Sequence, residues 1–166
     1  MLDLIIKNGK CYIDGQLKDV DISIKDGKIH KIGQINEEAK DIIKAEGLTV
    51  LPGCIDTQTH FREPGSTDTE DLHSGSRAAI VGGITAVFEM PNTNPPTSPK
   101  KEFQRKLDLA QNRMYCNYAF YFGATADNVD DLASLKDLEG CCGIKLFAGS
   151  STGNLLVAEE NDIDKV

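Results

Sequence analysis

Alternating apolar and polar positions, interrupted by turn residues, fill the start of the chain. Apolar residues gather in the segments 4–6, 20–24 and 29–32, and Asp26-Gly27 separates the last two of these. A period of two is typical of strands with one buried face, and Asp-Gly is a strong signal for a two-residue hairpin turn. We therefore predict that residues 1–52 form a small β-subdomain.

After Pro52 the pattern changes to apolar strands that alternate with amphipathic segments. The first expected strand lies near Ile55, and three more are expected over residues 84–90, 116–122 and 144–148. Each intervening segment is long enough to hold a helix. Strands that alternate with helices in this way are expected to run parallel.

Three helices are expected between these strands. Thr67-x-x-Glu70 has the form of a capping box and predicts the start of the first helix, which Gly82-Gly83 ends. Ser98-Pro99 supplies an N-cap and a first-turn proline for the second. The third is expected over residues 128–138.

Four β/α units make half of an eight-stranded barrel. The predicted fold class is α/β, with a partial TIM-type (β/α) barrel over residues 53–166 preceded by the small β-subdomain of residues 1–52. Functional sites of such barrels lie at the C-terminal ends of the strands. The candidate site residues that fall at or just beyond those ends are His60, Arg62, Asn92 and Lys145.

His60 and Lys145 are the residues that most require a chemical explanation. Strict alternation along an extended strand places Asp56, Gln58 and His60 on one face. Lys145 stands in an apolar strand, where burying a lysine is costly unless it is paired, neutralised or bound to a metal. Two ordinary explanations stay open: a hydrogen-bonded histidine at a strand end, and a lysine paired with Asp56 or Glu89.

Arg62 and Asn92 also have two explanations each. Arg62 suits an anionic substrate, because a guanidinium binds a carboxylate through two hydrogen bonds, but it would also pair with Glu63 or Asp68. Asn92 stands in a proline-rich segment, where turn formation alone explains an asparagine.

Three segments of the chain resemble, in order, the signatures of dihydroorotases, which belong to the amidohydrolase superfamily. They are residues 51–65 (LPGCIDTQTHFREPG), 75–95 (GSRAAIVGGITAVFEMPNTNP) and 143–157 (GIKLFAGSSTGNLLV). The resemblance implies that the first barrel strand ends in His-x-His-x-Arg. His60 then corresponds to the second histidine, and Gln58 replaces the first, although an amide is a weaker zinc ligand than imidazole.

The same resemblance implies the roles of the remaining site residues. Lys145 would be carboxylated on its amine and would bridge two zinc ions beside His60. Arg62 and Asn92 would bind the carboxylate of a small anionic cyclic amide, dihydroorotate or its open form carbamoyl aspartate. The first subdomain, residues 1–52, would be part of a composite β-sandwich.

The implied function is zinc-dependent hydrolysis of a cyclic amide in pyrimidine biosynthesis, or the reverse cyclisation. Zinc lowers the pKa of bound water to about 7 and so generates hydroxide at neutral pH. In the resembled family two further histidines and the proton-shuttling aspartate come from later strands, and no residue after Lys145 replaces them. We therefore expect no turnover by this chain alone.

Several alternatives stay open at this point. The chain would be a fragment or one half of a split enzyme, a non-catalytic interaction subunit, or the product of a decayed gene. Hydantoinases and allantoinases share the barrel and the lysine, so a hydrolase of that type is a further alternative. A second half-barrel or another copy of the chain is the expected protein partner.

Composition excludes several other classes. The net charge of −8 and the absence of basic runs argue against nucleic-acid binding. The five cysteines form no CxxC pair, which favours small buried side chains in a reducing cytoplasm. No stretch of the sequence is long and apolar enough for a signal peptide or a membrane span.

Overall fold

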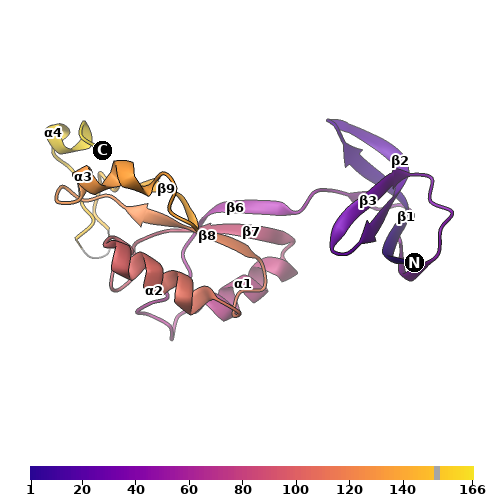
Figure 1. Cartoon of the computed structure of the whole chain (residues 1–166), viewed down its shortest axis with the longest axis horizontal. Coiled ribbons are helices and arrows are strands. Elements are labelled where there is room, and N and C mark those ends of the chain that lie inside the picture. The colour runs from indigo at the N-terminus through magenta and orange to yellow at the C-terminus, as the bar shows by residue number, and fades with distance from the viewer. Residues whose placement is uncertain (152–153) are drawn as a thin grey trace. The chain divides into compact units, whose positions relative to one another are not determined.

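The structure is a computed structural model that describes residues 1–151 and 154–166. It divides into two compact units, Met1–Pro52 and Gly53–Val166, each with its own sheet (Figure 1). The segment of residues 143–157 includes positions 152 and 153, which lie outside the described residues. No helix in the described part of the chain is long and apolar enough to cross a membrane.

The first unit is a five-stranded mixed sheet. Its strands are β1 (Leu2–Ile13), β2 (Gln16–Lys25), β3 (Lys28–Gly33), β4 (Ala39–Lys44) and β5 (Thr49–Val50). Antiparallel pairing joins β1, β2 and β3, whereas β4 and β5 run parallel to β1. Asp26 and Gly27 have φ angles of 52° and 71°, as a type I′ turn requires, so the predicted hairpin is confirmed.

The second unit is a four-stranded parallel sheet in the order β6-β7-β8-β9. Its strands are β6 (Cys54–Thr59), β7 (Ile84–Glu89), β8 (Asn117–Gly123) and β9 (Cys141–Lys145). Helices follow β6, β7 and β8 along the chain, as in the first half of a (β/α) barrel. The predicted fold class is confirmed.

The first helix, α1 (Leu72–Val81), begins later than predicted. The predicted capping box at Thr67 and Glu70 is wrong, because residues 66–70 form a turn in which Glu70 N donates to Ser66 O. Asp71 is the N-cap: its carboxylate accepts from Ser74 N at 2.6 Å, and the Ser74 hydroxyl accepts from Asp71 N at 3.2 Å. This reciprocal pair satisfies two amides at the helix start.

The other helices also differ from the sequence expectation. α2 (Lys100–Ala110) has Pro99 as its N-cap residue, because the Ser98 hydroxyl donates to Gly123 O instead of capping the helix. The third predicted helix is shorter than expected: α3 (Val129–Leu132) continues as a 3₁₀ turn, η1 (Ala133–Leu135). A short helix, α4 (Glu160–Ile163), lies near the end of the chain.

The last strand of the sheet is also displaced from its prediction. β9 begins at Cys141, which pairs with Phe120, and ends at Lys145, which pairs with Gly123. The expected strand over residues 144–148 is therefore wrong by three residues at each end. Beyond β9, an isolated parallel bridge joins Phe147 to Leu156.

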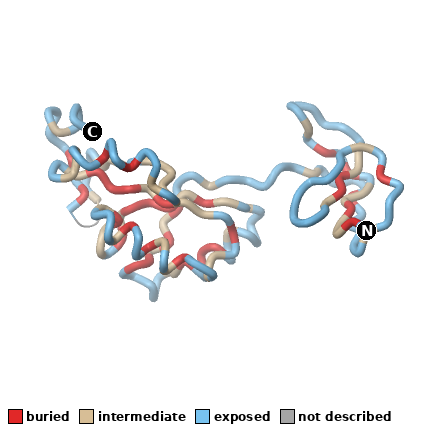
Figure 2. Tube along the Cα trace, viewed as in Figure 1, coloured by how far each residue is buried: buried red, intermediate tan, exposed pale blue. Residues whose placement is uncertain are grey.

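An aromatic cluster forms the core between α2 and the sheet. Phe103 lies with its ring centroid 6.5 Å from that of Phe120 and 6.1 Å from that of Phe122. Leu72 and Val87 are fully buried in the same cluster. Buried positions recur along the strands and helices of this unit (Figure 2). Each such side chain contributes about 1.5–3 kcal/mol to folding. This core fixes α1 and α2 against the strands whose C-terminal ends carry the candidate site.

Candidate functional site

The end of β6 departs from strict alternation. Asp56 pairs with Val87 and Thr59 with Glu89, so three residue steps on β6 match two on β7. Gln58 N donates to the Asp56 carboxylate at 3.0 Å within this irregularity. The prediction that Asp56, Gln58 and His60 share one face by simple alternation is therefore wrong, because a bulge interrupts the period of two.

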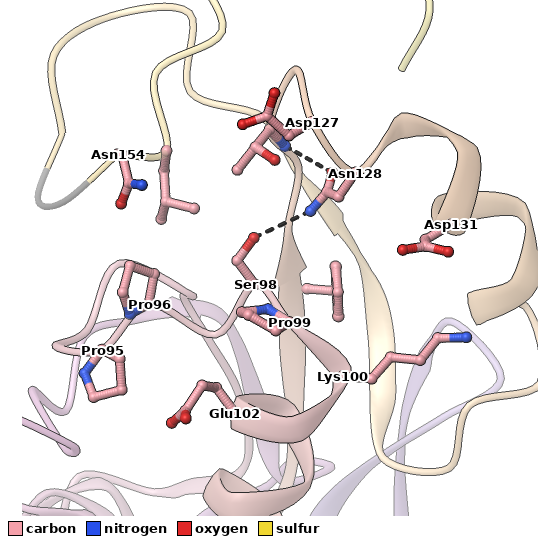
Figure 3. Close-up of a pocket in the computed structure, with 13 residues that line it drawn as sticks. Pro95, Pro96, Ser98, Pro99, Lys100, Glu102, Asp127, Asn128, Asp131 and Asn154 are labelled. Atoms are coloured by element: carbon pink, nitrogen blue, oxygen red, sulfur yellow. Dashed lines mark hydrogen bonds between the residues drawn. The ribbon is translucent and has the colours of Figure 1, made fainter.

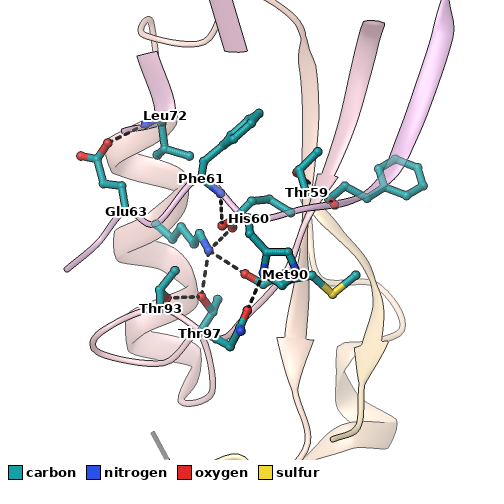
Figure 4. Close-up of polar contacts among 12 residues, drawn as sticks. Thr59, His60, Phe61, Glu63, Leu72, Met90, Thr93 and Thr97 are labelled. Carbon is teal, nitrogen blue, oxygen red and sulfur yellow. Dashed lines mark hydrogen bonds and ion pairs between the residues drawn. The ribbon is translucent and has the colours of Figure 1, made fainter. Parts of the chain in front are cut away.

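His60 and Asn92 meet at the C-terminal ends of β6 and β7. The His60 Nδ1 atom lies 2.9 Å from the Asn92 side-chain oxygen (Figure 4). With that oxygen as acceptor, Nδ1 carries the proton and Nε2 keeps its lone pair. Neutral imidazole with a free Nε2 is the form that binds metals.

The surroundings of His60 also favour the neutral ring. Burial lowers its pKa, and the hydrogen bond to Asn92 opposes this change. The positive charges of Arg62, Lys106 and Lys145 lower the pKa further. Burial and these charges together therefore favour the neutral imidazole.

Lys145 lies at the end of β9 but is not the buried lysine that the sequence suggested. Its side chain is only half-buried, with Nζ 5.2 Å from the centre of the Phe147 ring. The suggested pairing with Glu89 is wrong, because Glu89 is paired with Lys106. The Lys145 side chain is therefore partly open to solvent.

Arg62 lies beyond the end of β6, after His60 and Phe61, in a left-handed conformation with φ of 55°. The suggested pairing with Glu63 is wrong: that carboxylate accepts from Arg113 at 2.8 and 3.1 Å and from Leu72 N at 2.9 Å. Among the described residues Asp68 makes no ion pair with Arg62. The half-buried guanidinium of Arg62 is available for an anionic ligand.

Lys106 and Glu89 form a fully buried ion pair that was not predicted from the sequence. Their side chains are 0% and 1% exposed. Burial raises the pKa of Glu89 to about 7 and lowers the pKa of Lys106. A signal was present in the sequence, because Lys106 lies on the face of α2 that Phe103 and Ala110 share, where an apolar residue is expected.

A cavity of about 550 Å³ lies beyond the C-terminal end of β8 (Figure 3). Its lining residues do not include the candidate site residues His60, Asn92 and Lys145. Asn128 closes its wall: its side chain donates to Ser98 at 3.1 Å and to Gly123 O at 2.9 Å, and accepts from Thr125 N at 2.9 Å. Lys100, Glu102 and Asp131 give the cavity mixed charge. These contacts join the start of α2 to the loop after β8.

The donors at the strand ends fit part of a zinc site. His60 offers a neutral imidazole, Lys145 lies close enough to affect the pKa of that imidazole, and Gln58 is exposed on the bulge. Within residues 1–151 and 154–166, no group of three or more His, Cys, Asp or Glu side chains is arranged so that it could hold a metal ion. A complete tetrahedral set would therefore need donors other than these.

The chain is similar to curated cyclic amide hydrolases over nearly its whole length. It is 41% identical over 149 residues to an allantoinase of Escherichia coli O6:H1, covering 89% of this chain and 33% of that protein. It is 40% identical over 162 residues to a dihydroorotase of Methanosarcina acetivorans, covering 96% and 34%. The chain thus spans about a third of the length of these relatives.

Solved structures give the same result for the fold. The L-hydantoinase of Arthrobacter aurescens superposes with a TM-score of 0.89 at 29% identity, covering 99% of this chain and 37% of that one. The model of the amidohydrolase family matches residues 49–148, more than half of the 166 residues. The chain therefore belongs to the amidohydrolase family and is homologous to its cyclic amide hydrolases.

Proposed function

We propose that this chain carries the first part of a dihydroorotase-like, zinc-dependent active site. The observation that carries the proposal is the His60–Asn92 pair, in which a 2.9 Å contact at Nδ1 leaves Nε2 for a metal. Lys145, whose charge acts on the same imidazole, is the second proposed ligand in carboxylated form. Gln58 is a third donor of lower affinity.

An anionic ring is the proposed substrate class. Arg62 is half-buried beside His60, and a guanidinium binds a carboxylate through two hydrogen bonds. Asn92 keeps its amide NH₂ for the same ligand while its oxygen contacts His60. Dihydroorotate and carbamoyl aspartate carry the carboxylate that this pair would bind.

Zinc, when bound, would supply hydroxide and would polarise the ring carbonyl. The residues of this chain would hold one side of the metal and orient the substrate carboxylate. The resemblance implies further metal ligands and an aspartate that moves the proton, and we assign no residue of this chain to those roles. We therefore expect no measurable dihydroorotate hydrolysis by the 166-residue chain.

A neutral ring is the second candidate substrate. The chain is 41% identical to the E. coli allantoinase and 40% identical to the archaeal dihydroorotase, so sequence identity does not favour either substrate. The two candidates differ in charge: dihydroorotate is an anion, whereas allantoin, like hydantoin, carries no carboxylate and is neutral. Arg62 should matter for the first and not for the second.

Zinc binding tests the metal ligands. Zinc titrated into the chain in bicarbonate buffer should bind, and His60→Ala and Lys145→Ala should each weaken binding by at least tenfold, since each removes one ligand. Lys136→Ala, a lysine outside the strand ends, is the matched control. Equal affinity in the Lys145 and Lys136 variants would contradict the role of Lys145.

Ligand binding tests the substrate class. Carbamoyl aspartate should shift the amide signals of residues 60–63 and 92 in NMR spectra, and Arg62→Met should abolish the shifts. Arg77→Met, which removes an exposed arginine of α1, should not. Stronger shifts with hydantoin, unchanged in Arg62→Met, would favour the neutral ring and contradict the dihydroorotase proposal.

A further inference from the structure

A buried ion pair lies directly behind the two residues that meet at the strand ends. Glu89 is the last residue of β7, and Lys106 reaches it from the middle of α2. Burying two charged side chains costs more desolvation free energy than burying two apolar side chains of the same size. Apolar residues can therefore often replace a buried ion pair without loss of stability. Core packing alone therefore does not explain charged residues at these positions.

Glu89 is connected to the His60 side of the site. Its Oε1 atom accepts a hydrogen bond from Phe61 N at 3.2 Å, on the residue that follows His60 (Figure 4). Met90 N, one residue after Glu89, donates to Thr59 O at 2.9 Å, on the residue that precedes His60. The backbone on each side of His60 is thus tied to the end of β7.

Lys106 is connected to the Asn92 side of the site. Its ammonium donates to Met90 O at 3.2 Å and to the Thr97 hydroxyl at 3.3 Å. Thr97 N in turn donates to Pro91 O at 2.9 Å, which closes the loop of residues 91–97. Asn92 lies within this loop, so Lys106 holds the segments on either side of it.

We propose that Lys106 and Glu89 are positioning residues that hold His60 and Asn92 in register, so that the Asn92 oxygen faces His60 Nδ1 and directs the metal-binding lone pair to Nε2. Neither residue touches the ligand. One ion pair anchors two segments that lie thirty-two positions apart in the sequence. The relevance to metal binding rests on the proposed function, whereas the effect on the imidazole does not.

The imidazole tautomer reports this role directly. In the ¹⁵N-labelled chain at fixed neutral pH, long-range ¹H–¹⁵N spectra should show His60 with its proton on Nδ1. The double variant Glu89→Leu/Lys106→Met keeps the side-chain volume and removes both charges. In it, the ratio of the Nδ1-protonated to the Nε2-protonated form of His60 should fall roughly fivefold, as expected from losing one net hydrogen bond. Circular dichroism verifies that the variant is folded.

Two further variants make the outcome decisive. Thr97→Val removes one arm of Lys106 with little change in shape, and it should shift the tautomer ratio in the same direction even if the double variant fails to fold. Arg113→Met breaks a different ion pair, which joins the turn after α2 to Glu63 in the loop after β6, and should leave the ratio unchanged. A wild-type ratio in Thr97→Val, or an equal shift in Arg113→Met, would overturn the positioning role.

Zinc affinity adds a second measurement that separates the two proposals. If the chain binds zinc at His60, Thr97→Val should weaken that affinity by about tenfold, as losing a residue that orients a ligand does. Failure of the wild-type chain to bind zinc would contradict the proposed function. The tautomer measurement, made without metal, would still decide the positioning role.

Discussion

The cysteines differ widely in solvent exposure and in the pKa of the thiol. Cys11 and Cys116 are 0% and 7% exposed, and Cys54 is exposed. Burial raises the pKa of the Cys11 and Cys116 thiols, and raises that of Cys142 to about 12. The expectation that all cysteines are small buried side chains is wrong for Cys54, which lies on β6 at the edge of the described sheet.

These differences predict the order in which thiols react. At pH 8 a maleimide should label Cys54 first, because a raised pKa leaves less thiolate at Cys142 and because reagent does not reach Cys11 or Cys116. Cys54→Ser should remove the fast phase, which mass spectrometry measures. In urea all positions should react at similar rates, and a fast phase that persists in Cys54→Ser would contradict the burial pattern.

The candidate site was predictable at the residues whose sequence neighbours are distinctive. His60, Arg62 and Asn92 follow apolar strands and lie where the strands end. The identity of the buried lysine was not predictable from strand context, because Lys145 is flanked by apolar residues yet half-buried, and Lys106 lies in a helix with many polar residues yet is fully buried. Only the packing of α2 on β7 distinguishes them.

At the scale of the elements, the start of α1 is a specific and testable feature. Asp71→Ala should lower the free energy of unfolding by about 1 kcal/mol, because it removes the side-chain acceptor at the helix N-terminus. Thr67→Ala and Glu70→Ala, which change the residues of the false capping box, should have no effect. Urea unfolding followed by circular dichroism measures all three.

The same cap gives a pH dependence with a definite sign. Hydrogen bonds from Ser74 lower the pKa of Asp71, so the folded chain holds the ionised form more strongly than the unfolded chain does. The contribution is present at neutral pH and is lost as the pH falls through the range in which carboxylates titrate. The destabilisation by Asp71→Ala should therefore shrink in acid, and a constant difference across that range would argue against the ionic cap.

The ion pair between α2 and β7 should show strong coupling. Lys106→Met alone leaves the Glu89 carboxylate buried without its partner, which should cost about 3–5 kcal/mol, whereas Glu89→Leu/Lys106→Met should cost much less. Urea unfolding of the two single variants and the double variant gives the interaction energy. Additive single effects would mean that the two side chains act independently.

The number and order of the strands were predictable from apolar runs, but their limits were not. β7 and β8 agree with the sequence within one residue. β9 does not, because Gly143, at a φ of 157° that residues with a side chain rarely adopt, lies inside the strand, and Cys141 and Cys142 also belong to it. The first residue of each helix was also hard to predict, because several polar residues near it could serve as the N-cap. Local backbone geometry decides which one does.

At the scale of the whole molecule, the sheet of the second unit is open at both of its described edges. In the described part of the second unit, β6 and β9 each have a paired strand on one side only. Ile55 on β6 is 58% exposed and Ile144 on β9 is 39% exposed. Open strand edges that carry exposed apolar residues favour association with other strands.

The 166-residue chain should therefore self-associate at micromolar concentration through these edges. Ile55→Lys should reduce association, since an edge lysine is costly to pair against another strand. Val81→Lys is the matched control: it adds the same charge at a residue 84% exposed on α1, outside both edge strands. Light scattering after size-exclusion chromatography measures the mass of each species. If both substitutions reduce association equally, added charge rather than the β6 edge is responsible, and a stable dilute monomer of the unaltered chain would refute the edge argument itself.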